Sequence, residues 1–184
     1  MADDVVDPQP PLLLTRRLDP ASLESASHPG PIPLRLALAA EERTRLRGLR
    51  YSVCGRALLL QLPRGEPLRP GEWLAPAEGA ALVRVEAAPE ALLLVRAADP
   101  LALLQAAYHL GNRHVALELR EGELRLMEDP VLADLLAHRG LAVERRHEPF
   151  LPEGGAYAGA GPGPGHSHDH DHHDQDHHPG SPHR

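Results

Sequence analysis

Two of the four Asp-Pro pairs in this chain, Asp99-Pro100 and Asp129-Pro130, each precede an apolar helical pattern and place the tightest limit on how it can fold. Aspartate is a favoured helix N-cap and proline suits the first helical turn, so each pair predicts the start of a helix. The first helix should end near Gly111-Asn112 and the second at Gly140. The apolar residues that follow the helical period are Leu101, Leu104, Tyr108 and Leu110 in the first helix, and Val131, Leu132, Leu135 and Leu136 in the second.

Strand patterns surround these two helices. Residues 91–96 form a short apolar run, and residues 114–120 alternate, with Val115, Leu117 and Leu119 on one face. Gly122 should turn the chain into a hairpin partner at 123–127, and residues 141–146 complete the set. The predicted order is βαββαβ, a ferredoxin-like domain at residues 89–150. Such a short domain buries a thin core, which favours association with a second copy.

Residues 12–88 show a different pattern. Apolar and polar residues alternate in short runs at 33–38, 57–62 and 82–86, which are separated by Gly and Pro turns. These runs predict a small antiparallel sandwich or barrel as an N-terminal β domain. Residues 1–11 are acidic and rich in proline, and we expect them to be unstructured. The predicted class is therefore α+β, with residues 151–184 as a disordered tail.

Composition excludes several mechanisms. The chain has 19 basic residues besides histidine, all of them arginine. A Walker A loop and a Schiff-base enzyme both need lysine, so neither is possible. No HExxH pair and no GxSxG elbow occur, and we expect no catalytic constellation and no enzyme activity. The single cysteine, Cys54, rules out an intrachain disulfide and is interpreted as a buried core thiol.

Charge and hydropathy argue against nucleic acid and membrane as partners. The net charge is −7, and residues 153–184 contribute five acids and one arginine to it. The remainder therefore lacks the positive excess that phosphate binding requires. No apolar run approaches the length of a membrane span, and acids stand at the N-terminus where a signal peptide has positive charge. We therefore expect a cytoplasmic protein.

The last nineteen residues read HSHDHDHHDQDHHPGSPHR, with no aliphatic or aromatic side chain. Imidazole and carboxylate groups hold borderline divalent cations, so this density predicts a metal-binding tail. A purification tag and a solvated acidic tail are the alternatives, but the alternation with Asp and the preceding GAGPGPG linker are unlike a tag. The candidate ligands are His166, His168, His170, His172, His173, His177, His178 and His183.

Among the histidines outside the tail, His114 lies between the end of the first predicted helix and the start of the following strand. Taken alone, this position favours an ordinary surface histidine. His109, His138 and His147 lack a companion at chelating spacing, and His28 lies in a Pro/Gly-rich connection.

Three segments together resemble the family of UreE urease accessory proteins, the nickel metallochaperones. They are LPRGEPLRPGEWL at 62–74, AAYHLGNRHVALEL at 106–119 and PFLPEGGAY at 149–157. The similarity runs from about residue 12 to residue 157, and the histidine-rich tail completes it. The GNRH motif is its most specific part.

The resemblance implies an N-terminal β domain, a ferredoxin-like C-terminal domain and no bond chemistry in this chain. It implies that His114 of GNRH binds Ni²⁺ at the interface of a homodimer formed through the C-terminal domain. It also implies delivery of Ni²⁺ to urease apoprotein together with an accessory GTPase complex. Some relatives have histidines in the segment that matches 126–130, where this chain reads LMEDP, so that only Glu128 and Asp129 could offer oxygen there.

Two other functions stay open on the sequence. A generic histidine-rich protein that buffers or senses divalent metals would share the tail, and a metal-dependent hydrolase would share some ligands. The GNRH motif disfavours the first, and the concentration of ligands in the tail disfavours the second. Zn²⁺ or Cu²⁺ could occupy the same ligands as Ni²⁺, because imidazole suits all three ions.

Overall fold

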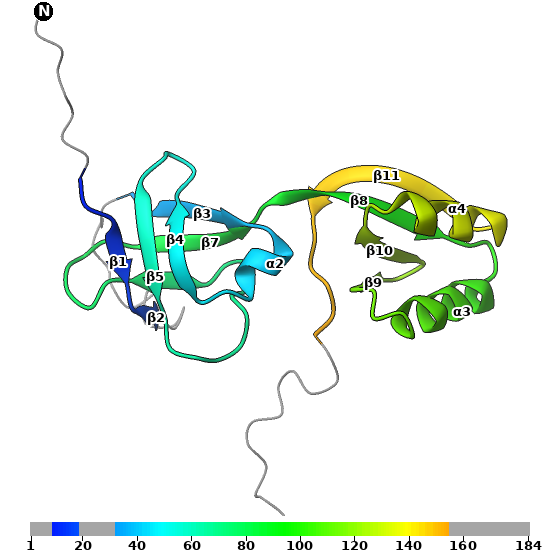
Figure 1. Cartoon of the computed structure of the whole chain (residues 1–184), viewed down its shortest axis with the longest axis horizontal. Helices are drawn as coiled ribbons and strands as arrows, with labels where there is room; N and C mark the ends of the chain where they lie inside the picture. The colour runs from blue at the N-terminus through cyan, green and yellow to red at the C-terminus, as the bar shows by residue number, and fades with distance from the viewer. Residues whose placement is uncertain (1–8, 19–31, 155–184) are drawn as a thin grey trace, which may run out of the picture.

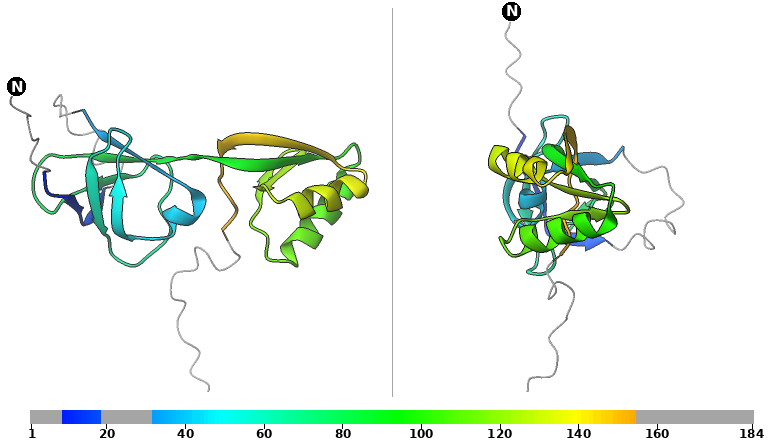
Figure 2. Two further views of the ribbon diagram at one scale, coloured as in Figure 1. Left: turned by 45° about the horizontal axis from the view of Figure 1, so that its top comes forward. Right: turned by 90° about the vertical axis from the view of Figure 1, so that its right-hand side faces the viewer.

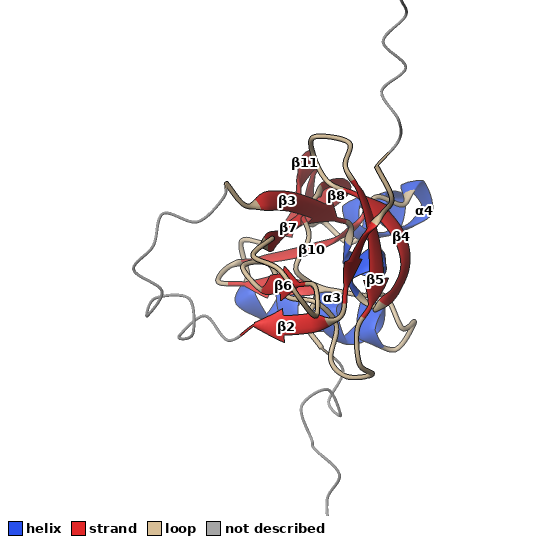
Figure 3. Cartoon of the chain, turned by 90° about the vertical axis from the view of Figure 1, so that its left-hand side faces the viewer, coloured by secondary structure: helices blue, strands red, loops and turns tan. Residues whose placement is uncertain are grey.

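The computed structural model describes residues 9–18 and 32–154, which form two hydrophobic cores joined by long strands (Figure 1). The predicted α+β class is confirmed. In the first core, three strands form a sheet in the order β1-β5-β4 and four form a second sheet in the order β2-β6-β7-β3 (Figure 3). These strands are β1 (Leu12–Leu14), β2 (Arg16–Leu18), β3 (Leu34–Leu38), β4 (Arg47–Tyr51), β5 (Ala57–Gln61), β6 (Trp73–Ala75) and β7 (Val83–Ala87).

The two sheets share one apolar core, as a sandwich does. Leu36 and Leu38 alternate with outward residues along β3, and Val83 and Val85 do so along β7, as the sequence pattern predicts. The prediction of purely antiparallel pairing was wrong, because β1 pairs with β5 and β3 pairs with β7 in parallel. Parallel partners require a long connection, which turn signals between neighbouring runs cannot reveal. The short helix α2 (Ala40–Arg43) was not predicted.

Strand β8 (Pro89–Arg96) follows β7 after one residue and carries the chain into the second core, as Figure 2 shows. The order there is β8, α3 (Pro100–Gly111), β9 (Glu118–Arg120), β10 (Glu123–Met127), α4 (Pro130–His138) and β11 (Ala142–Pro149), which is the order expected from the sequence. The sheet order is β11-β8-β10-β9, with every neighbour antiparallel. Both helices pack on one face, against Leu93, Val95, Leu124 and Leu126.

Both predicted helix starts are confirmed by their caps. The Asp99 carboxylate accepts a hydrogen bond from the Leu101 amide, and the Asp129 carboxylate accepts from the amides of Val131 and Leu132. The strand expected at 114–120 covers only Glu118–Arg120, because His114 and Val115 donate the hydrogen bonds that close α3 and residues 116–117 join no strand. Cys54 is exposed rather than buried, since it lies in the turn between β4 and β5.

A buried arginine fixes the junction between the two cores. The Arg43 side chain is only 5% exposed, and its guanidinium donates to the carbonyl oxygens of Leu38 at 3.0 Å and Phe150 at 2.6 Å. Burial lowers the pKa of Arg43, and the nearby Glu90 carboxylate opposes that shift. Glu90 also accepts a hydrogen bond from the Ala40 amide at 2.8 Å. These contacts tie α2 to the end of the β8–β11 ladder at which Glu90 pairs with Glu148.

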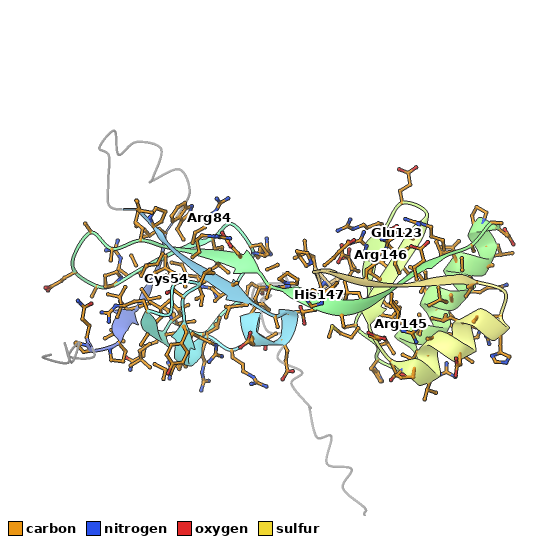
Figure 4. The ribbon with its side chains drawn as sticks, turned by 90° about the horizontal axis from the view of Figure 1, so that it is seen from above. Cys54, Arg84, Glu123, Arg145, Arg146 and His147 are labelled. Carbon is orange, nitrogen blue, oxygen red and sulfur yellow. The ribbon has the colours of Figure 1, made fainter. Side chains whose placement is uncertain are left out.

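The face of the second sheet that the helices leave uncovered carries paired charges. Along β10, Leu124 and Leu126 face the helices, whereas Glu123 and Arg125 lie on the other face and are both buried. Glu123 accepts hydrogen bonds from Arg125 at 2.7 Å and from Arg96 at 2.8 Å. Figure 4 shows Glu123 and Arg146 on the opposite side of the β8–β11 ladder from Arg145.

The first prediction concerns this charge network. Burial opposes ionisation of Glu123, but the hydrogen bonds from Arg125 and Arg96 outweigh it and lower its pKa. A depressed carboxyl pKa stabilises the fold above the unfolded value, about 4.3 for Glu, and that contribution is lost as pH falls through the folded value. We expect Glu123→Gln to lower the free energy of unfolding by about 1–3 kcal/mol at neutral pH, because a buried arginine loses a charged partner.

Urea denaturation of the wild type and Glu123→Gln at neutral pH and below about pH 4 measures this contribution. Glu121→Gln, in the exposed β9–β10 turn, is the control and should change little. A difference between wild type and Glu123→Gln that stays the same at both pH values would contradict the assigned ionic role.

Candidate metal centre

The position of His114 is set by the way α3 ends. The Val115 amide donates to the carbonyl oxygen of Leu110 at 3.1 Å, and the His114 amide donates to that of Gly111 at 2.9 Å. These two bonds form a Schellman motif. In this motif the residue directly before the final amide donor, here Val115, takes a left-handed conformation. His114 is that residue, with φ of 57°. Val115 and Leu110 both belong to the second core, which is the apolar contact that accompanies this motif.

The same motif ends α4, but with glycine at the left-handed position. The Leu141 amide donates to Leu136, the Gly140 amide donates to Ala137, and Gly140 has φ of 79°. Glycine adopts this conformation without a steric penalty, whereas an L-residue with a Cβ pays about 1–2 kcal/mol. Among the described residues, His114 is the one non-glycine with positive φ. A strained backbone at an exposed polar residue points to a function for its side chain.

His114 is exposed and offers one imidazole. Its neighbour Arg113 donates to the carbonyl oxygen of His109 at 3.0 Å, which ties the turn back to the helix. Across residues 9–18 and 32–154, no three His, Cys, Asp or Glu side chains come together as a preformed metal cage. A metal ion on His114 would therefore take further ligands from water, from the tail or from a second copy of the chain.

The structure places the other histidines apart from His114. His109 packs edge to face on Tyr108, with ring centroids 5.6 Å apart. The His138 ring lies 2.7 Å from the Asp134 carbonyl oxygen on the outside of α4. His147 is exposed on β11, at the place labelled in Figure 4. His28 and the eight histidines of the tail lie outside the described residues.

The two oxygen ligands considered at 126–130, Glu128 and Asp129, both already accept hydrogen bonds. Glu128 accepts a hydrogen bond from Arg145 at 2.6 Å, and Asp129 caps α4 through two backbone amides. A metal ion would have to displace these partners.

An apolar stripe on α3 leads toward the turn that holds His114. Leu101, Leu104 and Tyr108 follow one face of the helix and are 57%, 67% and 68% exposed, whereas Ala106 and Leu110 are buried on the other face. An apolar helical period usually marks the buried face, so the three exposed residues are a departure from expectation. The signal in the sequence is that α3 is apolar all round, which is typical of a helix covered on both sides. We call Leu101, Leu104 and Tyr108 the α3 stripe.

Comparison with known proteins gives a consistent family. Residues 90–179 match the model described as the UreE urease accessory protein, C-terminal domain. The chain is 61% identical over 126 residues to a urease accessory protein UreE of Parasynechococcus marenigrum (strain WH8102), covering 68% of this chain and 84% of that protein. It is 54% identical over 159 residues to the UreE of Synechococcus sp. (strain WH7805), covering 86% and 89%. A UreE from Burkholderia orbicola (strain AU 1054) is 52% identical over 124 residues, covering 67% of this chain and 60% of that protein.

The second prediction is that His114 is maintained at a cost in stability. His114→Gly should raise the free energy of unfolding by up to about 1 kcal/mol, because relief of left-handed strain exceeds the extra freedom of glycine in the unfolded chain. Gly140→Ala is the reciprocal control at the equivalent position of α4. No atom lies within 4 Å of the Cβ that Gly140→Ala adds. The expected loss of stability in this variant therefore comes from the backbone conformation alone. Thermal and urea unfolding of both variants measures this, and a loss on His114→Gly as large as that on Gly140→Ala would contradict it.

Proposed function

The chain belongs to the UreE urease accessory protein family, and we propose that it binds Ni²⁺ and delivers it for assembly of the urease metallocentre. The family supports a chaperone role in urease maturation. The relatives are named as accessory proteins and not as enzymes, in line with a chain that captures and transfers an ion without bond chemistry.

The observation that carries the proposal is an exposed histidine in a strained conformation, in the turn that directly follows the helix with the α3 stripe. In the proposal, two copies of the chain pack through their α3 stripes and form a homodimer. The two His114 side chains then come close enough to hold one Ni²⁺ between them. Burial of the exposed parts of three large apolar side chains per copy favours such packing, since each contributes a part of the roughly 1.5–3 kcal/mol that full burial would give.

A shared site with few protein ligands suits an ion that must be released. Imidazole is a good ligand for Ni²⁺, and water can complete the coordination shell. Groups from a partner protein can then replace water one at a time and take the ion over. In this proposal the partners are urease apoprotein and an accessory GTPase complex in the cytoplasm.

The tail has the role of capture. Eight histidines and four aspartates over nineteen residues offer many overlapping ligand sets, so that each metal–ligand contact can exchange with a neighbouring one. Zn²⁺ and Cu²⁺ can compete for these ligands, and selectivity for Ni²⁺ then depends on the availability of the ions and on the partner proteins.

The alternative function is a generic metal buffer that uses only the tail. It predicts that loss of His114 leaves metal binding unchanged. The UreE family match and the conformation of His114 favour the chaperone.

The third prediction concerns the shared ion. His114→Gly should remove the tightest Ni²⁺ site, at one ion per dimer, and leave the weaker tail sites, because the variant keeps the backbone of the turn. Calorimetric titration of the full-length chain with Ni²⁺ measures both classes of site. His147→Ala, which removes an exposed histidine elsewhere on the fold, is the matched control and should keep the tight site. A tight site that survives His114→Gly would exclude His114 as its ligand and favour the buffer.

The fourth prediction concerns the α3 stripe. Leu104→Glu should convert the dimer to monomers, since a charged side chain would be buried at the centre of the interface. Val131→Glu makes the same chemical change at a residue of α4 that is 76% exposed and outside the stripe, and should leave the dimer intact. Sedimentation at several protein concentrations distinguishes the two. A Leu104→Glu protein that stays dimeric would place the interface elsewhere.

A further inference from the structure

The two halves of the described fold carry opposite charge. Residues 9–18 and 32–88 contain eleven arginines, six glutamates and no aspartate, which gives +5. Residues 89–154 contain seven arginines and eleven acids, which gives −4. The whole chain has a net charge of −7. The positive charge is therefore concentrated on the first core of an otherwise acidic protein, and an acidic ligand would be attracted to it.

Five of these arginines gather around the loop at 63–65. A hollow of about 380 Å³ on one side of the loop is lined by Thr15, Arg16, Arg17, Pro63, Arg64 and Gly65. A second hollow of about 420 Å³ is lined by Thr44, Arg45, Leu46, Arg47, Leu62, Arg64 and Gly65. Arg64 borders both hollows. We call Arg16, Arg17, Arg45, Arg47 and Arg64 the arginine patch.

Acidic neighbours neutralise only part of the arginine patch. Arg17 lies 3.7 Å from Glu72, and Arg45 pairs with Glu41. Arg16, Arg47 and Arg64 form no ion pair with any described residue. All three are exposed. Guanidinium groups bind carboxylates in a paired geometry, so three such groups can take several carboxylates of one peptide.

The chain contains a peptide of matching charge. The four aspartates of residues 166–184 are spaced two or three residues apart, and a single arginine accompanies them. Thirty residues follow Gly154, which at about 3.3 Å each reach roughly 100 Å when extended. This length exceeds the diameter of a compact domain of this size, roughly 30 Å. Because the segment is tethered, its local concentration near the patch is far higher than that of a free peptide.

We propose that the arginine patch holds the aspartates of the tail in the metal-free protein, and that metal binding to the tail releases it. Each divalent ion adds two positive charges to the tail and engages carboxylates that would otherwise face arginine. Metal loading therefore weakens attraction to the patch. The tail of an ion-loaded chain becomes free to transfer its ion, whereas an empty tail is held back. The release step rests on the proposed function, while the docking step does not.

The test uses the full-length chain and its single cysteine. Cys54 is exposed just beyond the end of β4, and the strand between it and Arg47 spans roughly 17 Å. A nitroxide attached to Cys54 broadens amide signals of residues that approach the first core. Docking predicts that the amides of residues 169–176 lose intensity in the metal-free protein and regain it when the label is reduced.

Charge reversal and metal addition then test whether the arginine patch causes this loss of intensity. Arg47→Glu with Arg64→Glu should abolish the intensity loss, whereas Arg69→Glu with Arg139→Glu changes the net charge equally outside the patch and should preserve it. Diamagnetic Zn²⁺ should also abolish the loss, and 1 M salt should do so by shortening the screening length to about 3 Å. Calorimetry on the same samples reports Zn²⁺ binding, so that a failure of the tail to bind metal is distinguished from a failure of docking.

Three outcomes would overturn the proposal. The first is a tail that shows no approach to Cys54 in the metal-free wild type. The second is an approach that persists in the Arg47→Glu, Arg64→Glu protein. The third is broadening confined to the acidic residues 3–7, which would mean that the N-terminal segment and not the tail occupies the patch. If the tail does not approach and a DNA duplex binds the wild type but not the charge-reversed protein, the arginine patch is a phosphate-binding surface instead.

Discussion

The hydrogen-bonded turn at the end of α3 determines where the candidate metal ligand lies. Its two backbone bonds close the helix, and the contact between Val115 and Leu110 fixes the turn to the second core. His114 occupies the one position of that turn that requires a left-handed backbone. At the equivalent position of α4 the chain has glycine, the residue that this geometry favours. The imidazole thus lies at the surface on a turn whose backbone is hydrogen-bonded and packed against the second core.

The remainder of the second core packs around the helix that bears this turn. The sheet is covered on one face by both helices and on the other by paired charges in which Glu123 and Arg125 are buried. The buried Arg43 joins this unit to the first core through the Phe150 carbonyl group. A strained residue persists only where its surroundings determine it, and here the packing of α3 meets that condition.

Much of the second core could be predicted from the sequence, because its signals are local. The Asp-Pro caps, the Gly122 and Gly140 turns and the alternation of β10 each depend on residues close together in the chain. The parallel pairs of the first core could not be predicted, since β1 and β5 are joined by a long connection. The exposed position of Cys54 also escaped prediction, because an isolated cysteine has no pattern that reports its burial.

The candidate site was predictable in part. The GNRH segment directed attention to His114 through its resemblance to a family, but the alternating pattern suggested a strand there. Leu110 and Val115 are five residues apart, which is the spacing of the apolar pair in a Schellman motif. This spacing would have identified the motif and placed its left-handed residue directly before Val115. The α3 stripe was visible as an apolar period, but only the fold distinguishes the buried face from the exposed one. How the tail contributes ligands depends on residues outside the described part of the chain.

In the proposed homodimer, two copies of His114 share one Ni²⁺ ion. Anomalous X-ray diffraction at the nickel edge, from crystals of the full-length protein grown with one Ni²⁺ per two chains, tests it most directly. We expect one dominant peak on a twofold axis between two α3 helices, with an imidazole nitrogen of each His114 about 2 Å away. A dominant peak that lies away from both His114 residues would contradict it.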